Sequence, residues 1–152
     1  MAYFSTPAAR ATSGKATNAA CAEMNGIVYE TVATWSDRGR LVGVVGGDHS
    51  TPFGAIQAVS ERHPGLGVLH IDAHADLRVA YEGFTWSHAS IMHNVLGRLP
   101  GVARLVQVGI RDFCEDELDQ IRADRGRVTT FFDVWLSRQR HDGVPFARLA
   151  ER

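Results

Sequence analysis

Short apolar segments alternate with longer segments of helical character along this chain. Four short segments, either continuously apolar or alternating in polarity, predict strands over residues 41–45, 67–71, 104–110 and 128–132. The longer segments predict helices over residues 18–38, 51–62, 90–99 and 114–125. A short helical stretch and a polar end follow the last strand. Strands that alternate with helices predict an α/β protein with a mainly parallel sheet, in three α/β/α layers.

The length of 152 residues predicts one domain with a substantial core. Residues 1–16 are poor in acids and rich in Ser, Thr and Ala, a composition weakly similar to an organelle-targeting segment. A disordered head is the preferred interpretation, which leaves residues 17–152 as the α/β domain.

Charge and composition exclude several classes of protein. The formal net charge of −1 gives little attraction for nucleic acid, and no apolar stretch reaches the roughly 20 residues that cross a bilayer. Cys21 and Cys114 lie far apart, which is typical of two reduced thiols. With no secretory segment in view, we expect a cytoplasmic protein.

Candidate chemistry lies directly after the predicted strand at 67–71. Asp72, His74 and Asp76 recur at every second residue. In extended backbone this spacing places all three side chains on one face, where they could bind a single cation. Imidazole together with carboxylate suits Mn, Fe or Zn better than a metal that prefers thiolate. The segment therefore indicates a metal-dependent enzyme.

A second polar segment, Gly-Gly-Asp-His-Ser at residues 46–50, follows the predicted strand at 41–45. The carboxyl ends of parallel strands meet at one edge of a sheet, where ligands bind. The paired glycines permit a tight turn. We therefore expect His49 to meet Asp72, His74 and Asp76 around shared metal, with Asp48 orienting His49.

Residues 46–50 and 70–76 resemble the first two signature motifs of the ureohydrolases, which include arginase, agmatinase and formimidoylglutamase. The order and the spacing of both motifs fit, and residues 81–90 are most similar to agmatinase-type members. The resemblance implies an arginase-like fold and hydrolysis of a guanidino compound to urea and an amine by two hydroxide-bridged Mn²⁺ ions. It also implies that Asp72 bridges the metals, that His49 and Asp76 complete one site, and that His74 belongs to the other.

The same resemblance assigns a proton-shuttling role near the leaving amine to His88. An imidazole suits this role because its unperturbed pKa is about 6.5. A loop histidine that is hydrogen-bonded for structural reasons remains the alternative.

The family also carries a third motif, Ser-Phe-Asp-x-Asp, and a later glutamate that binds the guanidinium. Neither occurs in these 152 residues, so four of the six ligands that serve two metals are present. We expect a partial ureohydrolase domain that retains one metal or none. An inactive remnant, which binds at most one metal or associates with homologues, is therefore the alternative to an enzyme.

The substrate remains open at this point. Glu82 would favour agmatine, a dication that is hydrolysed to putrescine and urea, whereas Arg78 could pair with an acidic substrate such as that of formimidoylglutamase. The Ser-His pair at 87–88 favours agmatinase, and arginase is less favoured because the loop after Asp76 lacks its asparagine. Family members assemble through extensive interfaces, so the resemblance also allows a homo-oligomer.

Overall fold

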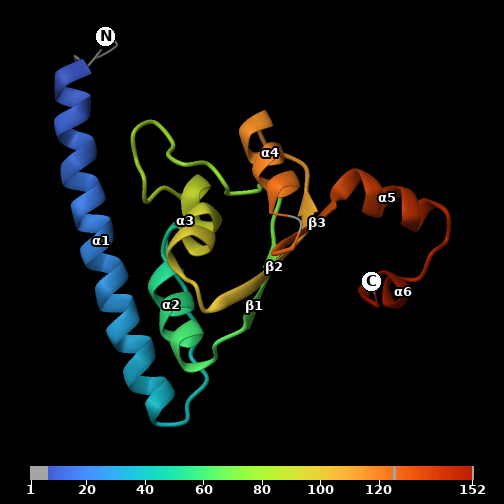
Figure 1. The fold of residues 1–152 in the computed structure, drawn as a ribbon, viewed down its shortest axis with the longest axis horizontal. Coiled ribbons are helices and arrows are strands. Elements are labelled where there is room, and N and C mark those ends of the chain that lie inside the picture. Colours follow the sequence, from blue (N-terminus) through green and yellow to red (C-terminus); the bar gives the residue numbers. More distant parts are fainter. Residues whose placement is uncertain (1–6, 125, 152) are drawn as a thin grey trace. The chain divides into compact units, whose positions relative to one another are not determined.

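The computed structural model describes residues 7–124 and 126–151, which divide into two compact units. Within these residues, unit 1 consists of 7–66 and 76–102, and unit 2 consists of 67–75, 103–124 and 126–151. The length of the chain predicted one domain, whereas the contacts within the structure divide the described residues into these two units. Each unit has its own set of secondary-structure elements (Figure 1).

Unit 1 is helical, and its elements are α1 (Pro7–Asp37), α2 (Phe53–Arg62), the short 3₁₀ helix η1 (His88–Ser90) and α3 (Ile91–Arg98). α1 packs along α2 through a small core of Val32, Ala33 and Ala58 (Figure 1). The approach is close because Gly54 lacks a side chain: a Cβ there would lie 2.1 Å from the carbonyl oxygen of Asn25.

The first helix is longer than its sequence pattern predicted. α1 begins at Pro7, so residues 7–16 belong to this helix, whereas the sequence favoured a disordered head there. Proline suits the first turn of a helix, and the alanines that follow have the highest helix propensity. Residues 1–6 of that predicted head lie outside the described residues.

The predicted strand at residues 41–45 is wrong. This segment forms no strand, and the side chains of Leu41 and Val45 are fully exposed. A buried strand requires partners along its edges, and among the described residues of unit 1 no segment supplies a ladder for it. Apolar composition alone therefore misidentified this segment.

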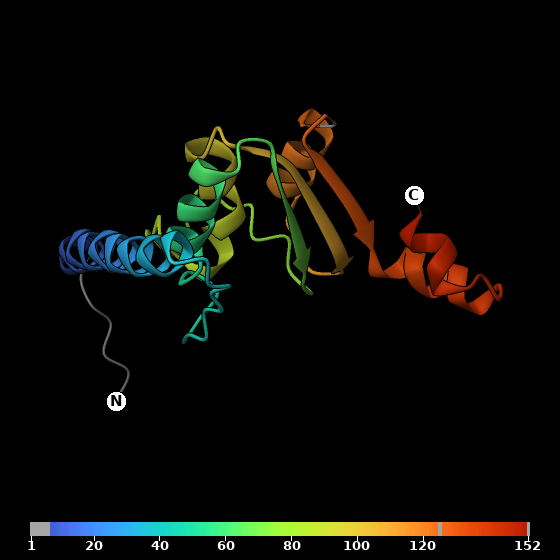
Figure 2. The same cartoon turned by 90° about the horizontal axis from the view of Figure 1, so that it is seen from below.

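Unit 2 is built on a three-stranded sheet with the order β1-β2-β3. The strands are β1 (Leu66–Ile71), β2 (Val102–Ile110) and β3 (Val128–Phe132), and they lie side by side in Figure 2. β2 and β3 are parallel, with Leu105 opposite Val128. The α/β class with a parallel sheet is thus confirmed.

Unit 2 also contains the helices α4 (Glu115–Ala123), α5 (Asp133–His141) and α6 (Phe146–Ala150). α4 connects β2 to β3, as a parallel pair requires. Its N-terminus is capped by Glu117, whose carboxylate accepts a hydrogen bond from the backbone N–H of Cys114 at 2.8 Å. Among the described residues, no helix is both long and apolar enough to cross a membrane.

Candidate metal centre

The backbone after β1 is held in place by the end of β2. The N–H of Asp72 donates to the carbonyl of Val108 at 3.1 Å, and the N–H groups of Arg111 and Asp112 both donate to the carbonyl of Ala73. These bonds extend the β1–β2 pairing past the end of β1. The first half of the Asp-x-His-x-Asp motif is therefore carried on ordered backbone.

A glycine bulge lies opposite Asp72. The pairing of β2 with β3 shifts register between Val108 and Ile110, and Gly109 between them has φ +91°. A Cβ on Gly109 would lie 3.2 Å from the carbonyl oxygen of Asp72. Bulges of this kind are frequent beside active sites, where they redirect the chain. Here the bulge makes room for the backbone of a predicted metal ligand.

Unit 2 brings together Asp72 and His74. One carboxylate oxygen of Asp72, Oδ1, accepts a hydrogen bond from the backbone N–H of His74 at 2.9 Å and lies 3.2 Å from Nδ1 of the same histidine. The Nε2 atom of His74 lies 3.9 Å from a carboxylate oxygen of Asp112. His74 is 61% exposed, so its ring is open to an incoming ion.

Unit 1 brings together His49 and Asp76. The Nδ1 atom of His49 lies 2.7 Å from Oδ2 of Asp76, whose side chain is only 4% exposed. The backbone of Asp76 has φ +54°, and its carbonyl accepts hydrogen bonds from the N–H groups of Met92 and His93. The chain passes from unit 2 to unit 1 between Ala75 and Asp76, so each unit contains two of the four predicted ligands.

Asp48 bonds within its own turn. Its carboxylate accepts hydrogen bonds from the hydroxyl and the backbone N–H of Ser50. The bond from the Ser50 hydroxyl is the main reason that the pKa of Asp48 lies below its usual value. A carboxylate oxygen of Asp48 also lies 4.0 Å from Nδ1 of His88. The ring nitrogen Nδ1 of His49 faces Asp76, and the orientation of His49 by Asp48 stays a prediction.

His88 lies at the end of a loop that unit 1 holds firmly. Asn18 on α1 accepts a hydrogen bond from the N–H of Thr85 and donates one to the carbonyl of Gly83. The ring of Trp86 packs edge-on against Phe53. His88 itself is 54% exposed, which leaves its ring accessible to a bound molecule.

Tyr81 links the remaining candidates for substrate contact. Its ring lies 5.7 Å from the ring of His88, and the guanidinium of Arg78 lies 5.2 Å from the ring centroid of Tyr81. Glu82 is exposed at the tip of the same loop with φ +51°. Arg78, Glu82 and His88 therefore belong to one loop system of unit 1.

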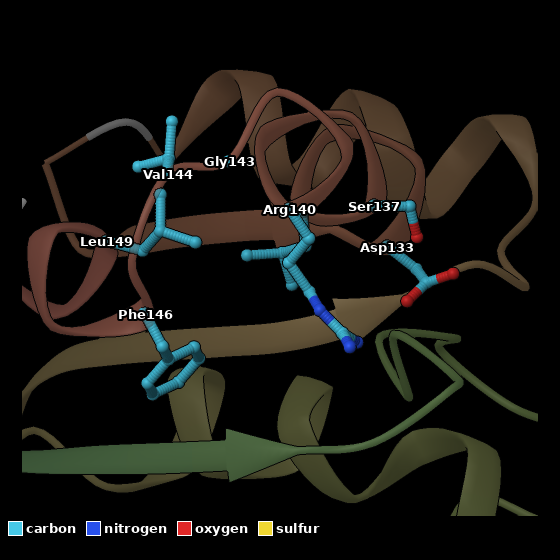
Figure 3. A pocket seen from close by; sticks show the side chains of 8 residues that line it. Asp133, Ser137, Arg140, Gly143, Val144, Phe146 and Leu149 are labelled. Atoms are coloured by element: carbon cyan, nitrogen blue, oxygen red, sulfur yellow. The ribbon is translucent and has the colours of Figure 1, made fainter.

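A cavity of about 560 Å³ lies elsewhere in unit 2 (Figure 3). Its lining includes the charged Asp133 and Arg140 of α5 and the apolar Val144, Phe146 and Leu149. None of the predicted site residues lines this cavity. The chemistry expected from the sequence is thus not located there.

The donor atoms fit a divalent transition metal. A carboxylate as buried as that of Asp76 is usually paired or bound to a metal. Two ligand atoms about 2.1 Å from one ion, at right angles to each other, lie about 3 Å apart, close to the 2.7 Å between His49 and Asp76. In each unit an imidazole and a carboxylate lie together, and this mixed nitrogen and oxygen donor set suits Mn, Fe or Zn.

Comparison with known proteins identifies the family. The model of the arginase family matches residues 8–143, nearly the whole chain. The chain belongs to the arginase family. The proclavaminate amidinohydrolase of Streptomyces clavuligerus is 39% identical over 90 residues, which are 57% of this chain and 29% of that protein.

Two further relatives match larger parts of the chain. The N(1)-aminopropylagmatine ureohydrolase of Thermus thermophilus is 32% identical over 130 residues, 85% of this chain and 41% of that protein. The structure of arginase from Medicago truncatula superposes with a TM-score of 0.67 at 36% identity, covering 78% of this chain and 37% of that one. The chain thus spans less than half the length of these relatives.

Sequence reasoning missed two residues beside the predicted ligands. The carboxylate of Asp112 faces His74, and Arg111 beside it donates to the carbonyl of Gly109. Gln107 is fully buried on β2 and bonds to His70. Asp112 could have been found because it directly follows a predicted strand. Gln107 could have been found because it is a polar residue inside an apolar strand.

Proposed function

We propose that this chain provides metal-binding residues of a ureohydrolase, an enzyme that hydrolyses the C–N bond of a guanidino or amidino group. The observation that carries the proposal is the pairing of His49 with buried Asp76 at 2.7 Å, at one end of the motif that begins with Asp72 and His74. Membership of the arginase family supports the same class of reaction.

In this proposal His49, Asp72, His74 and Asp76 are the metal ligands, and manganese is the metal. When bound, such ions act as Lewis acids that polarise the substrate and lower the pKa of water, so that hydrolysis proceeds near neutral pH. The buried carboxylate of Asp76 contributes negative charge, and the N–H groups at the start of α3 fix its backbone.

His88 is proposed to transfer a proton to the departing amine. Its exposed ring, 4.0 Å from Asp48 and in contact with Tyr81, is held in one region without being buried. Loss of a positioned acid or base typically lowers a rate by about 10²- to 10⁴-fold. His88→Ala is therefore expected to lower turnover to this extent while metal content stays unchanged.

Agmatine is the proposed substrate, with formimidoylglutamate and arginine as alternatives. Agmatine carries two positive charges, and the carboxylate of exposed Glu82 would attract its distal ammonium. Arg78 favours an acidic substrate instead, although the Tyr81 ring already stacks on its guanidinium. Urea release from agmatine and arginine, and formamide release from formimidoylglutamate, would distinguish the three.

A second candidate function is metal binding without catalysis. Within these 152 residues the family pattern for two metals is matched at four positions, which favours one ion over two. Metal content of the purified chain separates the two candidates. Two Mn²⁺ per chain with urea release would exclude the inactive alternative. One or no Mn²⁺, with no product from any of the three substrates, would exclude catalysis by this chain on its own.

A further inference from the structure

Unit 2 contains a buried hydrogen-bonded network that joins the second signature motif to strands β2 and β3. Gln107 on β2 is fully buried and His70 on β1 is 3% exposed. The Nε2 atom of Gln107 lies 3.1 Å from Nδ1 of His70 and donates to the carbonyl oxygen of Ala75 at 2.7 Å. The hydroxyl of Thr130 on β3 donates to Oε1 of Gln107 at 2.9 Å. The network therefore crosses all three strands.

The carbonyl of Ala75 determines which way the Gln107 amide points. A carbonyl oxygen can only accept a hydrogen bond, so the amide nitrogen, not the amide oxygen, has to face Ala75. The Thr130 hydroxyl then supplies a donor to the amide oxygen on the other side. The orientation of Gln107 is thus fixed by two partners of opposite character.

This orientation determines where His70 carries its proton. An amide nitrogen has no lone pair to offer, so Gln107 can only donate to Nδ1 of His70. A ring nitrogen that accepts a hydrogen bond is unprotonated, and the ring N–H is then on Nε2. The buried Nε2 atom lies 3.6 Å from Oδ2 of Asp72. An N–H group therefore faces this carboxylate oxygen, while the other, Oδ1, accepts from His74.

We propose that Gln107 is a positioning residue for the metal ligand Asp72, acting through the tautomer of His70. The N–H on Nε2 faces the Asp72 carboxylate at 3.6 Å and orients it, whereas the other tautomer would turn a lone pair toward the same oxygen. Neither Gln107 nor Thr130 is among the proposed metal ligands. The proposal rests on the proposed function, because it takes Asp72 as a metal ligand.

The test combines imidazole ¹⁵N NMR with Mn²⁺ titration of the full chain. The wild-type spectrum is expected to show His70 protonated at Nε2 alone. Gln107→Glu replaces the donor with an acceptor, so His70 has to carry a proton on Nδ1. Loss of an outer partner of a metal ligand typically costs about 10- to 100-fold in affinity, and we expect a loss of this size for Mn²⁺.

Matched variants keep the test decisive. Gln107→Met removes the hydrogen bonds without adding charge. It replaces Gln107→Glu in the Mn²⁺ titration if Gln107→Glu does not fold. Gln139→Glu and Gln139→Met on α5 are the controls, and both are expected to bind Mn²⁺ as the wild type does. The proposal is overturned if wild-type His70 carries its proton on Nδ1, or if folded Gln107 variants keep full Mn²⁺ affinity. A wild-type chain that binds no Mn²⁺ would instead contradict the proposed function, and the ¹⁵N spectrum would still decide the tautomer.

Discussion

The Nδ1 atom of His49 lies 2.7 Å from the Oδ2 atom of Asp76, although 27 residues separate the two along the chain. His49 follows an apolar segment that forms no strand, and Asp76 closes the motif that begins at the end of β1. The N–H groups of Met92 and His93 fix the backbone of Asp76 from the start of α3. The pair is therefore positioned by loop and helix contacts within unit 1.

Asp76 permits a test that separates charge from backbone conformation. Asparagine tolerates positive φ well, so Asp76→Asn should keep the fold while it removes the charge. We expect at least a tenfold loss of Mn²⁺ affinity with little change in the free energy of unfolding. Asp76→Ala should lose the same affinity and about 1–2 kcal/mol of stability in addition, because alanine is strained at φ +54°.

Isothermal titration with Mn²⁺ and urea denaturation would measure the two effects separately. Asp116→Asn, on the exposed first turn of α4, is the matched control and should leave Mn²⁺ binding unchanged. Unaltered affinity in Asp76→Asn would show that this carboxylate is not a metal ligand.

Gly109 allows the backbone of Asp72 to be moved without any change to a ligand. Gly109→Ala places a Cβ 3.2 Å from the Asp72 carbonyl and also strains a residue at φ +91°. We expect a loss of about 1–3 kcal/mol in the free energy of unfolding together with weaker Mn²⁺ binding. Gly67→Ala on β1 is the control, because a Cβ there meets no atom within 4 Å. Equal stability of the two variants would contradict the role assigned to the bulge.

The elements that were predicted well are those that contain their own signal. β1 is a valine- and leucine-containing run between turn residues, and α4 begins with three acids that favour the start of a helix. Both were found within two residues of their observed ends. The spacing of Asp72, His74 and Asp76 was equally local, so the candidate ligands could be named from the sequence.

What could not be predicted depends on partners distant in the sequence. Residues 41–45 have the composition of a buried strand, but a strand exists only where another strand supplies hydrogen bonds. Gln107 is a polar residue within a largely apolar strand, and its place there depends on His70, Ala75 and Thr130, which surround it. Single-sequence patterns do not contain such pairings.

Tyr29 and Glu61 give a prediction for pH. The Tyr29 hydroxyl donates to the Glu61 carboxylate at 2.6 Å, and this bond holds the pKa of Glu61 below its ordinary value of 4.5. A lowered carboxyl pKa stabilises the fold above the unfolded value, and that stability disappears as the pH falls through the folded value. Tyr29→Phe should therefore raise the pKa of Glu61 toward its ordinary value.

A ¹³C NMR titration of the side-chain carboxyl groups would measure this shift directly. The difference in stability between wild type and Tyr29→Phe should be present at pH 6–7 and shrink as the pH falls below 4.5 and through the lowered pKa of Glu61. The Gln57 amide also donates to Glu61, so a partial return of the pKa is expected. An unchanged Glu61 pKa in the variant would contradict the assigned cause.

The contact between α1 and α2 can be tested with two glycines that have opposite surroundings. Gly54→Ala would place a Cβ 2.1 Å from the Asn25 carbonyl and 2.8 Å from the Tyr29 nitrogen, so the helices would have to separate. Overpacking of this kind typically costs about 1–3 kcal/mol, and backbone atoms can yield less than side chains. Gly26→Ala, on α1 with no atom within 4 Å of the new Cβ, should instead stabilise the helix by up to about 1 kcal/mol.

Thermal unfolding followed by circular dichroism would compare the two variants. If both variants changed the stability in the same direction, this result would contradict the claim that close approach at Gly54 determines how α2 packs on α1.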